Sequence, residues 1–244
     1  MRSGPTATEL AVVRVGSVPS TQAVAFDLAE RGARDRTVVV ADHQSAGRGR
    51  RGRRWEDEPG ASLLVSILLR PRLGPDRLPG LSHVAAIAVG EALAAVAALA
   101  PRLKWPNDVL VGGRKIAGIL LESRLSAMNS AITILGIGVN VAQREFPSEL
   151  AGRATSVALE TGRAVDRDVL LAALLDRFDT WRACLEGQGF GPVRERWLAL
   201  SETMGRRVTV DGLTGIAVDL DQDGALVLET GAGRHRVVAG TIEG

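Results

Sequence analysis

The chain has 244 residues, enough for one sizeable domain and a small appendage, and its 45% hydrophobic and 24% charged content is ordinary for a globular protein. One cysteine, Cys184, excludes an internal disulfide and a multi-cysteine metal site, and three scattered histidines predict no zinc centre. The N-terminus carries no apolar signal-type stretch, and no apolar run approaches the roughly 20 residues of a membrane span. We therefore expect a cytoplasmic protein without a membrane partner.

Apolar periodicity predicts the regular elements of the first 200 residues. The expected strands are 11–16, 37–42, 61–71 and 131–142, and the expected helices are 19–32, 81–99, 166–186 and a short one at 193–201. Either Ser20 or Thr21 can cap the first of these helices, and Asp166 can cap the third. Residues 103–123 predict a hairpin that turns at Gly112-Gly113.

The character of the chain changes after about Ser201. Short alternating strands follow, separated by the turn sequences DG, DQDG and GAG. This pattern is typical of a small all-β barrel of SH3-like size. We therefore expect two domains, at residues 1–200 and 201–244, which pack together because no linker separates them.

The positive charge is concentrated in one short segment. Five arginines stand within seven positions, at Arg48, Arg50, Arg51, Arg53 and Arg54. The net charge of the chain is +2, and it falls to −3 when these five are set aside. A local basic cluster on an otherwise slightly acidic chain predicts a local anionic ligand rather than a general nucleic-acid surface.

Lysine is rare in this chain. Of the 30 basic residues only Lys104 and Lys115 are lysines, and they lie eleven positions apart. Because a lysine is a compact point charge and an arginine is a planar fork, the two differ at a tight anionic site. The pair therefore indicates two positions at which an arginine could not replace the lysine in binding an anion. The alternative interpretation is that both lysines stand by chance on a solvated face.

The arginine-rich segment also reads as G-x-G-x-x-G, through Gly47, Gly49 and Gly52. A dinucleotide fingerprint must open an apolar helix, but the sequence RRWEDEPG follows here, and an RNA-binding tail is usually long and terminal. An internal loop of alternating glycine and arginine instead suits an anion, which backbone N–H groups and guanidinium forks can surround. Since the like charges repel one another, we expect the loop to become ordered only when an anion fills it.

Two further segments point to the same ligand. Lys115 enters an otherwise apolar strand and needs an anionic partner if it points inward, whereas Trp105 is expected to pack in the core. Gly136 and Gly138 stand at alternate positions of a predicted strand, so both face one side and let a ligand approach the backbone. For His43 a structural role and a catalytic role both stay open.

Four segments in this order and spacing resemble one family. The segments STQ, HQSAGRGRRGRRW, KWPNDVLVGGRKIAGILLE and GIGVNV are together similar to those of biotin–protein ligases, and the resemblance extends from about residue 11 to the C-terminus. It implies an α+β fold in which helices flank a mixed sheet, like the core of class II aminoacyl-tRNA synthetases and lipoate ligases. The closing β barrel also resembles the C-terminal domain of that family.

The resemblance implies two half-reactions. The biotin carboxylate attacks the α-phosphate of ATP with Mg²⁺, giving biotinyl-5′-AMP and pyrophosphate, and a lysine of a biotin carboxyl carrier domain then accepts the biotinyl group. The implied partner is the carrier protein of biotin-dependent carboxylases, and a homodimer is possible. The STQ motif begins after only 19 residues, too few for a winged helix-turn-helix, so no repressor activity and no specific nucleic acid are expected.

The resemblance also assigns residues. The catalytic residues would be Lys115, Arg50 and Arg48. The biotin site would comprise Ser20, Thr21, Gln22, Gln44, Gly47, Arg48, Gly49, Arg50, Lys115, Gly118, Gly136 and Gly138. ATP and the adenylate would be bound by Arg50, Arg53, Trp55, Asn107, Lys115 and Asn140, with Trp55 closing over the nucleotide side. Asp108 would lie near Mg²⁺ bound through the ATP phosphates.

Two alternatives belong to other classes. A lipoate or octanoate ligase shares the core fold, but the intact glycine–arginine loop argues against it. A nucleic-acid-binding module could use the basic segment, but the net charge of −3 elsewhere and the 3% aromatic content argue against that.

Overall fold

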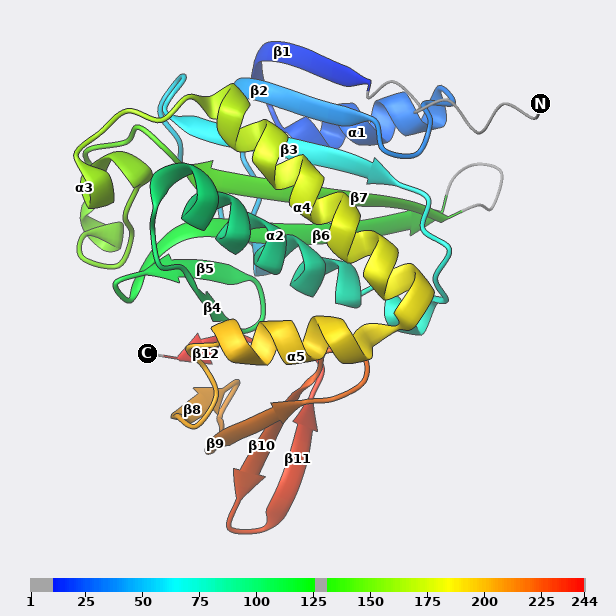
Figure 1. Cartoon of the computed structure of the whole chain (residues 1–244), viewed down its shortest axis with the longest axis vertical. Coiled ribbons are helices and arrows are strands. Elements are labelled where there is room, and N and C mark those ends of the chain that lie inside the picture. Colours follow the sequence, from blue (N-terminus) through cyan, green and yellow to red (C-terminus); the bar gives the residue numbers. More distant parts are fainter. Residues whose placement is uncertain (1–10, 126–130, 244) are drawn as a thin grey trace.

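A computed structural model describes residues 11–125 and 131–243 of the chain. Helices flank a seven-stranded mixed sheet of order β1-β2-β3-β7-β6-β5-β4, as predicted (Figure 1). Its strands are β1 (Val12–Val18), β2 (Val38–Gln44), β3 (Ser62–Leu69), β4 (Arg102–Lys104), β5 (Asp108–Val111), β6 (Arg114–Leu125) and β7 (Ala131–Asn140). Strands β1 and β2 run parallel, whereas the other neighbouring pairs are antiparallel.

The two faces of the sheet carry different helices. Along β2, Val38 and Val40 join the core cluster with α2 and α4, while Val39 packs with Phe26 of α1 on the opposite side. This follows from the pleat, because successive side chains of a strand point to opposite faces. The α-helices are α1 (Thr21–Glu30), α2 (Gly80–Ala97), α3 (Val157–Thr161), α4 (Arg167–Gln188) and α5 (Phe190–Leu200), and short 3-10 turns lie at Arg50–Gly52, Pro75–Arg77 and Ser148–Leu150.

Most of the predicted elements are confirmed, with differences at their ends. Asp166 caps α4 as predicted, because its carboxylate accepts hydrogen bonds from the backbone N–H groups of Asp168 and Val169. Strand β2 runs two residues beyond the predicted end at 42, because Gln44 still pairs with Val18 of β1. The structure also contains β4 and α3, which the sequence patterns did not predict because each spans only three to five residues.

Helix α2 is the core helix that its nearly all-apolar sequence predicts. Within the described residues, Pro75–Ala97 is the one helical segment whose length and apolar composition would allow it to cross a membrane. In the fold 72% of its apolar window is buried, between the sheet and α4. Burial against the sheet therefore accounts for its composition.

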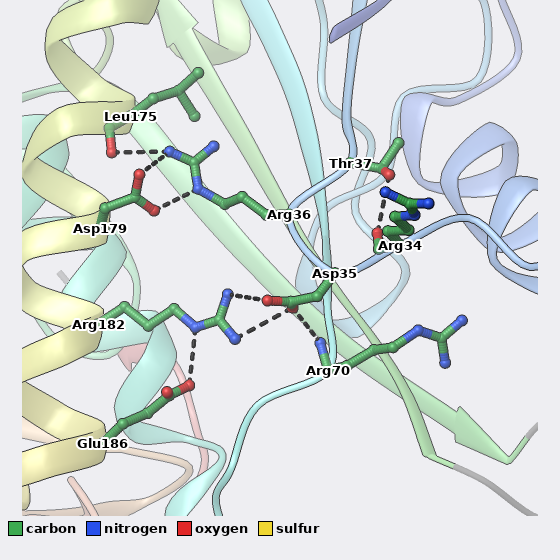
Figure 2. A network of polar contacts seen from close by, with 9 residues as sticks. All are labelled: Arg34, Asp35, Arg36, Thr37, Arg70, Leu175, Asp179, Arg182 and Glu186. Atoms are coloured by element: carbon green, nitrogen blue, oxygen red, sulfur yellow. Dashed lines mark hydrogen bonds and ion pairs between the residues drawn. The ribbon is translucent and has the colours of Figure 1, made fainter. Parts of the chain in front are cut away.

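A polar network ties the start of β2 to α4 (Figure 2). The guanidinium of Arg182 lies 3.0 Å from Asp35 and 2.9 Å from Glu186, and Arg36 pairs with Asp179. The same Asp35 accepts the backbone N–H of Arg70 at 2.6 Å. These contacts fix the loop before β2 to α4.

The C-terminal part is all-β, as predicted. Strands β8 (Arg207–Val210), β9 (Leu213–Leu220), β10 (Leu226–Thr230), β11 (Gly233–Val237) and β12 (Ile242–Glu243) form an antiparallel sheet of order β11-β10-β9-β8-β12. The turn before β10 docks on the larger sheet, where Trp105 donates its indole N–H to the Gly224 carbonyl at 3.1 Å. Trp105 is 1% exposed, so its predicted core position is confirmed. The division at 200 and 201 stays a proposal.

Candidate active site

A cavity of about 870 Å³ opens on the α1 side of the sheet and brings the predicted residues together. It is lined by Ser20, Thr21, Gln22, Gln44, Arg48, Gly49, Arg50, Arg53, Trp55, Asn107, Asp108, Lys115, Gly118, Gly136, Gly138 and Asn140. Gly47 is the one predicted residue outside this lining, because its Cα faces the Trp55 carbonyl, which a Cβ would meet at 2.6 Å. Segments nearly 120 residues apart in sequence therefore converge on one site.

The floor of the cavity is a patch of glycines in the sheet. Ile132 and Ile134 of β7 pack under α1, and the next two residues on the same face are Gly136 and Gly138. Gly138 pairs directly with Gly118 of β6. Since alternate residues of a strand share a face, the change from isoleucine to glycine creates the space beside α1.

The indole ring of Trp55 lies on this floor. A Cβ added to Gly138 would stand 2.6 Å from the ring, and one added to Gly118 would stand 3.0 Å from it. The ring nitrogen is buried and has no hydrogen-bond partner within the described residues. The ring thus lies over glycines that the resemblance assigns to biotin, and the role of Trp55 on the nucleotide side stays a prediction.

The start of α1 forms one wall. Ser20 is the N-cap by position, but its side chain makes no capping bond. Gln44 does this work from β2, because its Oε1 accepts the Thr21 N–H at 2.7 Å and the Thr21 hydroxyl at 2.9 Å. Ser66 donates to the same hydroxyl at 2.8 Å. The helix start is thereby fixed by three buried polar side chains at the cavity wall.

Gln22 extends this wall towards β6. Its Nε2 donates to the Leu120 carbonyl at 3.1 Å, and a Cβ at Gly136 would stand 2.9 Å from its amide carbon. Asn140, at the end of β7, is buried and donates to the Thr155 carbonyl at 2.9 Å. Both amides are therefore held in one orientation by backbone carbonyls.

A β-bulge aims Lys115 into the cavity. The pairing of β5 with β6 shifts register, so that Val109 pairs with Ala117 but Leu110 pairs with Lys115. The extra residue, Ile116, is fully buried in the core on the helical side. Without the bulge, Lys115 would face the same way as Ala117, into that core. A bulge next to an active site commonly redirects a side chain in this manner.

Lys115 is surrounded by groups that fix its ammonium. Its Nζ lies 2.6 Å from Asp108 Oδ1 and 5.7 Å from the centre of the Trp55 ring. Its backbone N–H donates to the Arg153 carbonyl at 2.8 Å, and its carbonyl accepts the Thr155 N–H at the same distance. Asp108 is therefore the anionic partner that the sequence predicted for an inward lysine. An isolated parallel bridge to Ala154 also holds the main chain of Lys115.

The arginine-rich segment forms another part of the cavity lining. Arg48 pairs with Glu122 at 2.8 Å, and Arg50 donates to Asn107 Oδ1 at 3.5 Å. Burial lowers the pKa of the Arg50 guanidinium, with the nearby Asp108 acting in the opposite direction. The guanidinium stays charged even so, because the normal pKa of an arginine lies far above neutral pH. Arg50 is thus a partly desolvated cation, which binds an anion more strongly than a solvated one does.

Charge in the cavity is strongly positive. Its basic lining residues are Arg48, Arg50, Arg53, Arg54, Lys104, Lys115 and Arg153, whereas its acidic ones are Glu56 and Asp108. Both lysines of the chain are among them, which agrees with the expectation that neither is placed by chance. The balance predicts a polyanionic ligand.

Two further parts of the lining were not predicted. Gly240, Thr241 and Ile242 come from the start of β12 and the segment before it, and residues 146–154 contribute from the loop after β7. Neither part carries a motif, so only the tertiary fold brings them there. His43 is not in the lining but pairs with Asp57 at 2.9 Å, which favours the structural role for it.

The comparisons with known proteins agree with this geometry. Residues 15–140 match the biotin/lipoate A/B protein ligase family, and residues 203–243 match the biotin protein ligase C-terminal domain. The chain belongs to the biotin/lipoate protein ligase family. A biotin–[acetyl-CoA-carboxylase] ligase of Paracoccus denitrificans is 40% identical over 232 residues, which are 91% of this chain and 96% of that protein.

Two further members of the family extend the comparison. A bifunctional ligase/repressor of Bacillus spizizenii is 35% identical over 232 residues, covering 93% of this chain and 71% of that one. The biotin protein ligase of Aquifex aeolicus, solved in complex with biotin and ATP, superimposes with a TM-score of 0.84 at 32% identity, over 96% of this chain and 97% of that one. The similarity therefore covers both the mixed sheet and the C-terminal sheet.

Proposed function

We propose that the chain is a biotin–[acetyl-CoA-carboxylase] ligase. The enzyme activates biotin with ATP to biotinyl-5′-AMP and then transfers the biotinyl group to a lysine of a carrier domain. The observation that carries the proposal is the position of Lys115. A bulge turns this lysine into a cavity that is also lined by the glycine floor and by the arginines of the basic segment. The similarity to the Paracoccus denitrificans ligase, which spans nearly both chains, supports the same activity.

The glycine floor and the start of α1 suit the biotin end. The missing side chains at Gly118 and Gly138 let a flat ring lie on the sheet, where the Trp55 indole lies in this structure, so a biotin ring at these glycines would displace that indole. Thr21 and Gln22 present a hydroxyl and an amide that can hydrogen-bond a polar ureido group. In this arrangement Gln44 orients Thr21, since its carbonyl oxygen is already shared by the Thr21 N–H and hydroxyl.

The cationic groups suit the reacting end. A carboxylate oxygen forms a bond to the α-phosphorus of ATP, and the bond to the pyrophosphate leaving group breaks. Both reactants are anions, so positioning and charge stabilisation supply the catalysis, and no protein nucleophile is needed. Lys115, Arg48 and Arg50 converge where the carboxylate and the α-phosphate would meet.

The second half-reaction uses the same groups. The amine of the carrier lysine attacks the acyl carbon of the mixed anhydride, and AMP leaves as the amide forms and a proton is released. Cations that bind the α-phosphate also stabilise the departing AMP. The cavity mouth beside the arginines is therefore the proposed entrance for the carrier lysine.

Magnesium fits the site as an ion bound mainly by phosphate. Asp108 and Glu56 are the carboxylates of the cavity lining, and Asp108 is already paired with Lys115. Mg²⁺ usually keeps several waters and takes one or two carboxylates besides substrate phosphates, so this donor set suits Mg-ATP. When bound, the ion would neutralise charge on the polyphosphate, and Asp108 would be the residue to hold it.

One incubation tests the function. The chain, biotin, Mg-ATP and a biotin carboxyl carrier domain are mixed, and mass spectrometry measures the carrier. We expect one added biotinyl group on the carrier, which requires ATP and disappears when the target lysine is replaced by arginine. Replacing biotin with lipoate or octanoate is expected to give no product. Modification by lipoate or octanoate alone would contradict the proposal and favour the sister activity.

A further inference from the structure

The arginine loop, residues 47–55, is a small hairpin whose base and tip are separately fixed. Arg48 pairs with Arg54 as an antiparallel bridge, and the Gly49 N–H donates to the Arg53 carbonyl at 2.8 Å. The tip is the single turn Arg50–Gly52. The base continues from β2, so a contact at the tip decides how the hairpin lies across the cavity.

Arg51 at the tip differs from the other four arginines. Those four line the cavity, whereas Arg51 is not among the lining residues of the described chain. Its backbone is in the left-handed region, with φ 58° and ψ 35°, which few residues other than glycine adopt. Its Nη1 donates to Asp211 Oδ1 at 2.5 Å, so the side chain points to the C-terminal sheet.

The backbone of the β8–β9 turn holds Asp211 where it accepts the hydrogen bond from Arg51. It occupies the turn between β8 and β9 with φ 48°, and Gly212 follows with φ 86°, as in a tight two-residue hairpin. Arg51 lowers the pKa of the Asp211 carboxyl, and a backbone hydrogen bond from Thr241 acts in the same direction. Thr241 itself lines the cavity. One carboxylate thus joins the loop tip to the part of the C-terminal sheet that reaches the site.

We propose that Asp211 is a positioning residue of the ligase reaction, which latches the tip of the arginine loop to the C-terminal sheet through Arg51. The proposal rests on the proposed function for its effect on the adenylate. With the latch closed, Arg48 and Arg50 stay over the cavity, and biotinyl-5′-AMP is retained until the carrier arrives. With the latch open, the loop swings from its base and the adenylate escapes sooner.

The latch gives a role to Arg51, the one arginine of the five in this segment that does not line the cavity. It also gives the C-terminal sheet a role in catalysis, since the sheet holds the loop that covers the nucleotide. The pair is exposed, at 53% for the Arg51 side chain and 44% for that of Asp211. Such a pair is weak and is screened by salt, which suits a contact that must open for the carrier lysine in each turnover.

Two measurements on Asp211→Asn test the latch. The first is the rate at which preformed biotinyl-5′-AMP leaves the enzyme, and the second is the rate of tryptic cleavage at the arginines of the loop without ligand. We expect both rates to rise about two- to fivefold at low ionic strength. The differences from wild type shrink when NaCl rises from about 0.05 to about 0.5 M, because salt screens the pair in the wild type.

A matched control is Glu229→Gln, which removes an exposed ion pair with Arg234 in the same sheet, away from the loop. It is expected to leave both rates unchanged. The double variant Arg51→Asp with Asp211→Arg restores the pair in reverse and is expected to slow adenylate release towards the wild-type rate. A merely structural role of Asp211 would not give this rescue.

The two proposals fail in different ways. If the wild type forms no adenylate from biotin and Mg-ATP, the proposed function is wrong, while the tryptic comparison still tests the latch. If the adenylate forms but Asp211→Asn and Glu229→Gln behave alike in both release and cleavage, the latch is overturned. Equal rates for the single and the charge-reversed double variant would also overturn it.

Discussion

The ammonium of Lys115 and the carboxylate of Asp108 lie 2.6 Å apart in the cavity, on neighbouring strands β6 and β5. The bulge at Ile116 makes this pairing possible, because it turns the lysine away from the core. Asp108 holds the cation in place, and under the proposed function an entering carboxylate or phosphate would replace it as the partner of Lys115. The pair thus combines a fixed position with an available charge.

Replacing Lys115 by alanine is expected to slow adenylate formation by about 10²- to 10³-fold, the usual loss when one preorganised stabilising group is removed from an active site. The measurement is pyrophosphate release with biotin and Mg-ATP. The control is Arg114→Ala at the adjacent position, where the arginine pairs with Glu160 outside the cavity. Near-normal pyrophosphate release by Lys115→Ala would contradict its catalytic role.

The glycine floor makes a second prediction. A methyl group at Gly138 would meet the ring of Trp55 at 2.6 Å, so Gly138→Ala must displace either that ring or a bound ligand. We expect biotin affinity to fall more than about tenfold, or about 1.4 kcal/mol, with little change in melting temperature. Calorimetry with biotin measures the affinity.

The control for the floor is Gly187→Ala on α4, where an added Cβ meets nothing within 4 Å. That substitution is expected to leave biotin binding unchanged and to stabilise the helix by about 0.5–1 kcal/mol. An unchanged affinity in Gly138→Ala would mean that no ligand approaches the sheet at this glycine.

The sequence predicted those parts of the site that have local signatures. Alternate glycines in β7 predicted an open sheet face, and the glycine–arginine run predicted an anion-binding loop. It could not predict the direction of Lys115, because the register shift that turns it depends on pairing between β5 and β6. Nor could it predict Thr241 in the lining, since only docking of the C-terminal sheet brings that residue to the cavity.

In the fold, too, elements with a local sequence pattern were predicted and elements that depend on tertiary pairing were not. Long periodic segments such as α2 and α4 were predicted nearly to their ends, since many residues repeat one pattern. The three-residue β4 has too few residues for a pattern and exists because it pairs with β5. The contact of Trp55 with the glycine floor could not be predicted either, because it depends on glycines more than 60 residues away.

Docking of the two sheets depends on Trp105. Its indole N–H donates to the Gly224 carbonyl at 3.1 Å in a buried contact, and its backbone N–H donates to Thr203. Trp105→Phe keeps an aromatic ring but removes the indole donor, so we expect a loss of about 1–3 kcal/mol in the free energy of unfolding. Urea denaturation measures it.

The comparison for Trp105 is Trp181→Phe on α4. The indole of Trp181 donates to Glu91 at 3.0 Å in a partly buried contact, where water can replace the lost bond. A smaller loss is therefore expected there. Equal losses in the two variants would show that the contact with Gly224 has no special weight in stability.

His83 predicts a pH dependence of stability. Its ring is 4% exposed between α2 and α5, against Phe190 and Trp197, and burial lowers its pKa from 6.5 to about 4. Below pH 6.5 the unfolded chain therefore binds a proton at this histidine that the folded chain does not. The free energy of unfolding must then fall as the pH falls from 6.5 towards 4, by about 1.4 kcal/mol per pH unit from this group.

Between pH 6.5 and pH 5 this single group is expected to remove about 2 kcal/mol, measured by urea denaturation at both values. His83→Leu fills the same contact with an apolar side chain that cannot bind a proton. It is expected to reduce the loss of stability between the two pH values by about 2 kcal/mol. His235→Leu on β11 removes an imidazole outside this buried contact and is expected to keep the wild-type fall. Because Gly224 also packs on the His83 ring, acid should loosen the C-terminal sheet first. If His83→Leu loses as much stability between the two pH values as the wild type, the fall must come from other groups.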